Sequence, residues 1–150
     1  PLRSLQIMRS VLIFDQNILY METIFLAQFM GALYGLLAVV FGAFGAHALK
    51  KKLTPELLHS FETGVKYQMY HAILLLVLSF NLGFDQPLDS AIVNCFIFGT
   101  LLFSFSIYAL CLSAAKGEKL RFLGPFTPIG GLLLVVGWAL LFYKFISPIL

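Results

Sequence analysis

The chain has 150 residues, of which 60% are hydrophobic and 11% charged, with a net charge of +3. Soluble domains average about 45–50% apolar and about 25% charged residues. This composition excludes a water-soluble domain, because 150 residues cannot bury so much apolar surface. No linker divides the sequence, so we expect one bundle in a lipid environment.

Four uncharged apolar stretches determine the predicted architecture: residues 24–46, 72–82, 91–115 and 129–145. A helix needs about 20 apolar residues to cross a bilayer. The first and third stretches reach this length, and the fourth reaches it if residues 147–150 extend it. The second does so only if its helix begins earlier, within residues 62–71. We therefore predict an all-α polytopic membrane protein with four transmembrane helices, the second long and partly amphipathic.

The N-terminal segment is treated separately from this bundle. Residues 1–20 carry Arg3, Arg9 and Asp15 among apolar residues and are too polar to span. We interpret them as an N-terminal extension, either foreign to the native chain or lying at the membrane interface. Met21 is the expected native start, residues 21–150 form a single four-helix transmembrane domain, and the first helix is predicted from Glu22 to about His47.

Small residues follow one face of that first helix at intervals of three or four residues. They are Gly31, Gly35, Ala38, Gly42 and Gly45. Small side chains let helix backbones approach closely in lipid. This pattern predicts packing against the chain's own helices or, as the alternative, self-association between copies. Gly64, Gly130 and Gly131 are assigned the same packing role.

The second helix has a clear start. Thr54 is the expected N-cap, Pro55 the first helical residue and Glu56 an acid near the positive end of the helix dipole. No breaker follows before residue 81, so the helix is predicted over residues 55–82. Glu62 and Lys66 lie four residues apart and are expected to neutralise each other, with a proton relay or contact with a substrate as the alternative.

Shorter signals delimit the last two helices. Residues 81–89 read as a short polar turn that contains Asp85 and Asp89. The third helix is predicted to end at Ala115. Thr127 is the expected N-cap of the fourth helix, with Pro128 in its first turn.

The cations predict the orientation of the chain. Two loops on one side hold seven of them: Lys50, Lys51, Lys52, Lys66, Lys116, Lys119 and Arg121. By the positive-inside rule these loops are cytoplasmic and both termini lie outside. The expected location is the bacterial plasma membrane, or the mitochondrial inner membrane in a eukaryote.

Polar groups within the predicted spans are the candidate functional residues, because such groups are costly in lipid. They are His47, Glu62, Lys66, Gln68 and His71. We expect His71 to make an interhelical hydrogen bond. No second histidine stands at a helical ligand spacing and the aspartates lie outside the apolar stretches, so neither a metal nor another cofactor is expected. Cys95 and Cys111 point to nearly opposite sides of one helix and cannot pair.

Three motifs occur in a distinctive order. They are GAFGAHAL at residues 42–49, FETGVKYQMYHA at residues 61–72, and GPFTPIGG at residues 124–131, followed by Gly137 and Trp138. In these motifs the chain resembles domain-of-unknown-function family 423, the YgdD-like small inner-membrane proteins, with mitochondrial transmembrane protein 256 as a relative. The resemblance covers about residues 21–143. It implies a four-helix membrane protein and brings no settled activity.

Two functions remain open at this point. The first is a non-catalytic accessory or scaffold subunit that binds protein or lipid partners, in a membrane-protein complex or a homo-oligomer. The alternative is a small oligomeric transporter or channel for ions, protons or a lipid. The sequence has no nucleophile motif, Walker loop or paired carboxylates, so we expect no enzyme, and no nucleic acid is expected as a partner.

Overall fold

The computed structural model describes residues 2–84, 86–118 and 120–148, with only the backbone for residues 2–7, 9–17, 19 and 121. Every regular element in these residues is helical. In chain order they are α1 (Leu2–Phe44), the π-helical turn η1 (Gly45–Leu49), α2 (Pro55–Asn81), α3 (Pro87–Thr100), the π-helical turn η2 (Leu101–Phe105), α4 (Ser106–Ala115), the short 3-10 turn η3 (Arg121–Leu123) and α5 (Phe126–Ile146).

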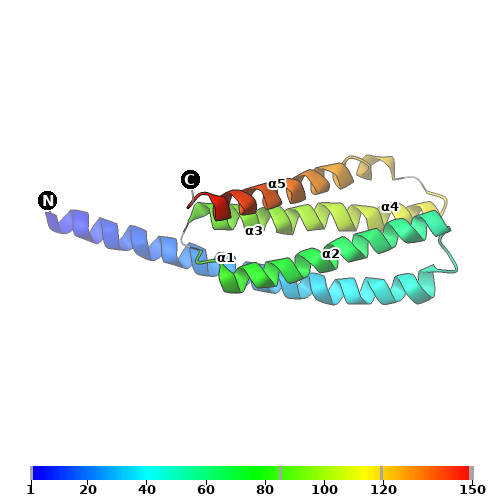
Figure 1. Cartoon of the computed structure of the whole chain (residues 1–150), viewed down its shortest axis with the longest axis horizontal. Coiled ribbons are helices and arrows are strands. Elements are labelled where there is room, and N and C mark those ends of the chain that lie inside the picture. The colour runs from blue at the N-terminus through cyan, green and yellow to red at the C-terminus, as the bar shows by residue number, and fades with distance from the viewer. Residues whose placement is uncertain (1, 85, 119, 149–150) are drawn as a thin grey trace.

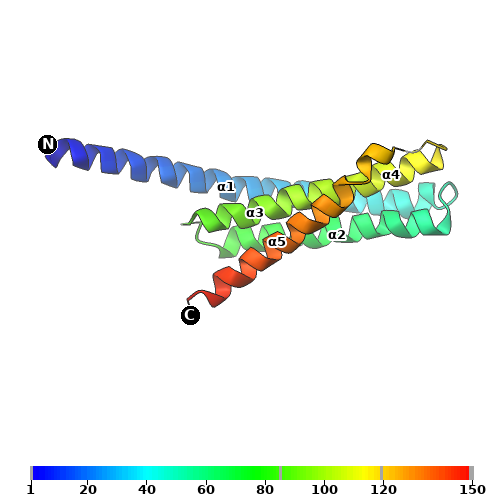
Figure 2. The same cartoon turned by 90° about the horizontal axis from the view of Figure 1, so that it is seen from above.

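The helices lie nearly alongside one another in a long bundle (Figure 1). Helix α2 runs back along α1, and α3 with η2 and α4 forms one continuous rod beside them. Figure 2 shows that α5 crosses this rod obliquely, while the N-terminal part of α1 extends beyond the bundle. The α1–α2 and α4–α5 connections lie at one end, and the C-terminus and the α2–α3 connection lie at the other.

Three helical segments are long and apolar enough to cross a membrane: Tyr20–Leu49, Pro87–Ala115 and Phe126–Ile146. The predicted all-α class and membrane-spanning character are confirmed. The predicted count of four spans is supported only in part, because α2 does not meet the same criterion. Its first half carries Glu56, Glu62 and Lys66, which reduce its mean hydropathy.

The start of α2 agrees with its predicted chemistry. Thr54 is the N-cap, and its hydroxyl accepts a hydrogen bond from the Leu57 backbone N–H at 3.4 Å. Pro55 occupies the first turn, where no backbone N–H is needed. Hydrogen bonds from its own backbone N–H and from the Thr54 side chain lower the pKa of Glu56 below its usual value.

Two predicted helix boundaries are wrong. Helix α1 begins at Leu2 rather than Glu22, because residues 2–21 contain no glycine or proline and polar residues do not end a helix. Helix α5 begins at Phe126 with Pro125 at the N-cap, so Thr127 is not the cap. The Thr127 hydroxyl instead lies 2.7 Å from the Ser106 hydroxyl of α4.

The core lies mainly between α1, α2, α3 and α5. Its fully buried members include Ala27, Leu75, Ile92 and Phe96, and a smaller cluster around Phe61 lies towards the α1–α2 connection. Phe84, in the α2–α3 connection, has a φ of 51° and a ring that is 1% exposed. It therefore closes the core at that end.

Candidate functional site: a buried polar network at the centre of the bundle

Three polar side chains form a hydrogen-bonded chain through the bundle interior. The Tyr108 hydroxyl donates to Gln68 Oε1 at 2.7 Å, and Gln68 Nε2 donates to the Tyr34 carbonyl at 2.9 Å. The Tyr34 hydroxyl donates in turn to the Ile97 carbonyl at 2.9 Å. These bonds link α1, α2, α3 and α4. Because polar groups in a dry interior are costly without partners, they hold the four helices in one register.

Gly64 makes this network possible. A Cβ at this position would lie 2.8 Å from Tyr108 Cε1, closer than real side chains approach. The Tyr108 ring fits between Phe41 and Phe61, with both ring centroids 4.8 Å away. The missing side chain at Gly64 thus allows Tyr108 to reach Gln68, one helical turn along α2.

The π-helical turn η2 lies beside the network. Ser104 in this turn and Thr100 at the end of α3 are fully buried, and their hydroxyl oxygens have no hydrogen-bond partner among the described residues. A Cβ at Gly130 would lie 2.3 Å from the Phe103 backbone nitrogen, so α5 contacts this turn backbone to backbone. Single π-helical turns inside α-helices occur frequently at functional sites.

His71 lies next to this region with only one of its ring nitrogens satisfied. Its Nδ1 is 2.8 Å from the Tyr67 carbonyl, which can only accept, so Nδ1 carries the proton. Its Nε2 is buried and has no partner among the described residues. The rings of Phe96 and Trp138 lie 5.6 and 6.5 Å away. The predicted interhelical hydrogen bond is therefore wrong, because the bond that forms lies within α2.

The structure separates the five predicted polar residues into two groups. Gln68 and His71 are buried, whereas His47, Glu62 and Lys66 are exposed. Glu62 and Lys66 form no ion pair, although both are described, so their predicted mutual neutralisation is wrong. Their i, i+4 spacing permits an ion pair, but both side chains are exposed and their charged groups do not contact each other.

Four residues of the buried region were missed by the sequence reading: Tyr34, Thr100, Ser104 and Tyr108. Each is an uncharged polar residue within a long apolar stretch, and this was the available signal. Their mutual proximity depends on helix pairing, which the sequence does not supply.

A second polar site lies at the opposite end of the bundle. Asp89 in the first turn of α3 is fully buried and forms an ion pair with Lys144 of α5. Neither carboxylate oxygen accepts an aligned hydrogen bond from a described residue, so the contact is an electrostatic one. The sequence predicted that Asp89 lies in a polar turn outside the spans, and this is wrong because the residue belongs to α3 and contacts Lys144 of α5.

The predicted packing glycines all contact other parts of the chain. On α1, Gly31 and Gly35 face Ala72 of α2, Gly42 faces Val65, and Gly45 faces Phe61. Gly130 and Gly131 both face Phe103. The small-residue stripe of α1 is therefore covered by α2 of the same chain.

The arrangement provides hydrogen-bond donors and acceptors rather than an activated nucleophile. No three His, Cys, Asp or Glu side chains gather as potential metal ligands in the described part of the chain. The two cysteines, Cys95 and Cys111, are free.

Comparisons with known proteins agree with the motifs. A family described as protein of unknown function (DUF423) matches residues 41–131. A UPF0382 membrane protein of Schizosaccharomyces pombe is 42% identical over 73% of this chain and 92% of its own. One from Staphylococcus saprophyticus is 39% identical over 75% of this chain and 89% of its own. YwdK, a UPF0382 membrane protein of Bacillus subtilis, is 36% identical over the same shares.

No solved structure gives a significant match. All three motifs on which the resemblance was based fall within the matched residues 41–131. The relatives are membrane proteins, in agreement with the three spans. The chain therefore belongs to the DUF423 family of membrane proteins, whose function is not known.

Proposed function

We propose that this protein is a non-catalytic accessory or scaffold subunit that binds another membrane protein through the outer face of α2. The observation that carries this proposal is a polar stripe on that face. Glu62, Lys66 and Tyr70 are exposed on it, with Tyr70 at 60% exposure. We call these three residues the α2 stripe.

The proposal includes α2 as a fourth span. Its 27 residues extend about 40 Å, more than the roughly 30 Å hydrocarbon core. Ala72, Leu75 and Leu78 are buried against neighbouring helices. Gly45 of α1 faces Phe61 and Gly31 faces Ala72, so α2 lies level with the apolar part of α1. A helix packed along a span at the same depth is expected to share its environment.

The α2 stripe then has an unusual position. Ionisable residues within spans normally face the bundle interior, a water-filled cavity or a partner. Lys66 lies one turn deeper than Glu62 and faces away from its own bundle. A neighbouring protein with a complementary polar face would provide the missing interactions. This neighbour is a different subunit or a second copy of the chain.

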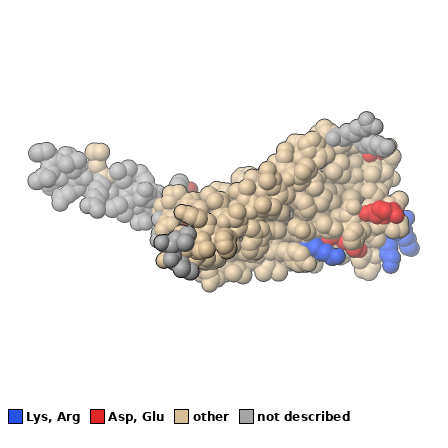
Figure 3. Space-filling view, turned by 45° about the horizontal axis from the view of Figure 1, so that its top comes forward, with Lys and Arg blue, Asp and Glu red and all other residues tan. Residues whose placement is uncertain are grey.

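The distribution of charge supports basic loops in the cytoplasm and termini outside. Charged side chains gather towards the end of the bundle that holds the α1–α2 and α4–α5 connections (Figure 3). Lys50, Lys51 and Lys52 lie in the first of these connections and Lys116 in the second. By the positive-inside rule this end faces the cytoplasm, which fits the bacterial plasma membrane or the mitochondrial inner membrane.

The test is gentle native extraction with and without the stripe. We expect the wild type to migrate as a complex. In a Glu62→Gln, Lys66→Met variant the amount of co-purified partner should fall about tenfold or more, as for the loss of a desolvated charge contact. Val135→Ala on the exposed face of α5 is the matched control and should retain the partner. A wild-type protein that is monomeric in every mild detergent, with nothing co-purifying, would exclude the proposal.

A transporter or channel is the second candidate, and the buried network favours it. His71, Thr100 and Ser104 place buried polar atoms without a described partner beside a π-helical turn, next to the hydrogen-bonded Gln68. Flux into or out of proteoliposomes that carry an ion gradient or a pH gradient tests this role. Flux that disappears in Gln68→Leu or His71→Ala, with folding intact, would favour transport, and no flux in the wild type would remove it.

A further inference from the structure

A pocket of about 410 Å³ lies at the cationic end of the bundle, and its lining includes no residue of the buried network or of the α2 stripe. Its origin lies in the unequal lengths of neighbouring helices. Thr127, in the first turn of α5, is level with Ser106, because their hydroxyls are 2.7 Å apart. Helix α4 continues from Ser106 to Ala115, beyond the start of α5. The last two turns of α4 are therefore not covered by α5.

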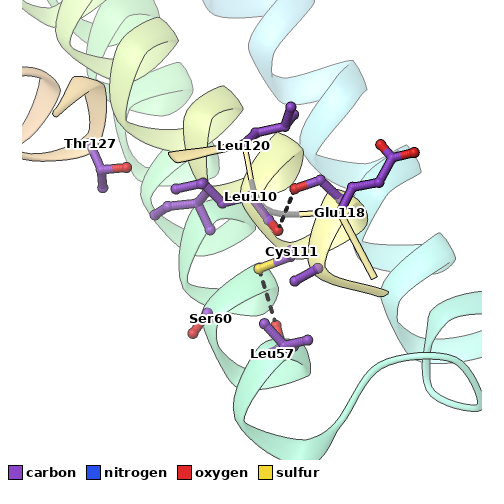
Figure 4. Close-up of a pocket in the computed structure, with 10 residues that line it drawn as sticks. Leu57, Ser60, Leu110, Cys111, Glu118, Leu120 and Thr127 are labelled. Atoms are coloured by element: carbon purple, nitrogen blue, oxygen red, sulfur yellow. Dashed lines mark hydrogen bonds between the residues drawn. The ribbon is translucent and has the colours of Figure 1, made fainter. Parts of the chain in front are cut away.

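The walls of this pocket are mostly apolar. Leu57 of α2 forms one side, Ile107 and Leu110 of α4 form another, and Leu120 of the α4–α5 connection covers it. In Figure 4 the side chains of Leu110 and Leu120 lie close together, with Thr127 and Ser60 on the periphery. The carboxylate of Glu118 points away from this apolar centre. An occupant would meet hydrocarbon inside and hydroxyl groups at the edge.

The residues around the pocket indicate a position where the hydrocarbon of a bilayer meets its headgroups. The pocket begins beside the membrane-spanning part of α4 and ends at the connection that carries Lys116, which is exposed. Phe122 in the same connection is 67% exposed and Phe126 is 40% exposed. Exposed aromatic rings next to a basic loop are typical of a membrane interface. The volume also falls within the range of pockets that hold small ligands.

We propose that this pocket binds one acyl chain of a phospholipid from the surrounding leaflet, with the lipid phosphate next to Lys116. The apolar walls match the chain, and the Lys116 ammonium matches the phosphate charge. Ser60 and Thr127 lie at the deeper edge of the pocket, because Thr127 is level with Ser106 at the start of α4. Leu57 and Ser60 lie on a different side of α2 from Glu62 and Lys66, so this site is independent of the proposed function.

The experiment uses the full chain in vesicles of phosphatidylethanolamine and phosphatidylglycerol. These vesicles contain a phospholipid with a diazirine in the half of one acyl chain nearer the headgroup. After illumination, we expect mass spectrometry to find adducts concentrated on the peptides of Leu57, Leu110 and Leu120. Adducts spread evenly over the exposed faces of α1 and α5 would overturn the proposal.

One variant fills the pocket and a second reverses the charge at position 116. Ala114→Trp places a large ring in the pocket and should remove most of these adducts, while Ala139→Trp on the exposed face of α5 should leave them unchanged. Lys116→Glu should reduce them several-fold without changing the pocket. Equal labelling in all three variants would contradict the assignment. Because Lys116 is exposed, its variant keeps the test valid even if Ala114→Trp fails to fold.

The lipid class has its own control. A diazirine fatty acid without a headgroup should label the pocket peptides less than the phospholipid does. Labelling by the free fatty acid alone would overturn the phospholipid assignment.

Discussion

Two pairs of opposite charges lie towards opposite ends of the bundle and differ in sequence separation, burial and contact. Asp89 and Lys144 are 55 residues apart in sequence, yet they contact one another, with Asp89 fully buried. Glu62 and Lys66 are one helical turn apart, yet both are exposed and they form no ion pair. The first pair is used to join α3 to α5. The second pair is exposed and joins no helices, and the proposed accessory function depends on this difference.

The largest expected effect comes from breaking the buried pair. Lys144→Met leaves the Asp89 carboxylate buried without a counter-charge and should lower the free energy of unfolding by about 3–5 kcal/mol. Unfolding in mixed micelles with increasing dodecyl sulfate measures it. The Asp89→Asn, Lys144→Met double variant should recover much of the loss, because no unpaired charge remains. A single-variant loss close to zero would show that the pair does not join the helices.

The second largest loss in the free energy of unfolding is expected in the buried network. Gln68→Leu removes the acceptor of the Tyr108 hydroxyl and should cost about 1–3 kcal/mol in the same titration. Its matched control is Tyr70→Phe on the exposed face of α2, which should change little. Equal losses in both variants would mean that Gln68 has no special role in holding the helices.

Gly64 and Gly35 provide a finer comparison of close packing. Gly64→Ala would meet Tyr108 at 2.8 Å and should cost about 1–2 kcal/mol through overpacking. Gly35→Ala would meet the Ala72 Cβ at 3.9 Å, so it should be neutral or stabilise by up to about 1 kcal/mol through helix propensity. Identical effects at the two positions would contradict the helix contacts described here.

The smallest effect on stability is expected at the α2 stripe. Lys66→Met and Glu62→Gln should each change the free energy of unfolding by less than about 0.5 kcal/mol, as is usual for surface positions without a partner in the chain. A loss similar to that of Lys144→Met would show that these charges act within the bundle.

The contrast also shows how far the sequence reading could reach. Local signals were sufficient where one segment contains the whole arrangement, as in the Thr54–Pro55–Glu56 start of α2. The apolar stretches predicted the three clear spans, and the ordered motifs predicted the family. In contrast, the Asp89–Lys144 contact and the Tyr34–Gln68–Tyr108 network join distant segments. Their formation depends on which helices pair and at which height, and single-segment patterns carry no such information.

Periodicity was misleading where it suggested a partner on the same helix. The favourable spacing of Glu62 and Lys66 predicted an ion pair, but an exposed pair contributes little energy and each side chain has other conformations. His71 shows the reverse error, because the nearest acceptor was the Tyr67 carbonyl within its own helix.

The most direct test of the central claim is photo-crosslinking at position 66 in living cells. A benzoylphenylalanine at this position should form a discrete adduct with another protein, whereas the same probe at position 135 on α5 should form none. The account predicts that difference. A probe at position 66 that gives only lipid adducts, or the same pattern as position 135, would contradict it.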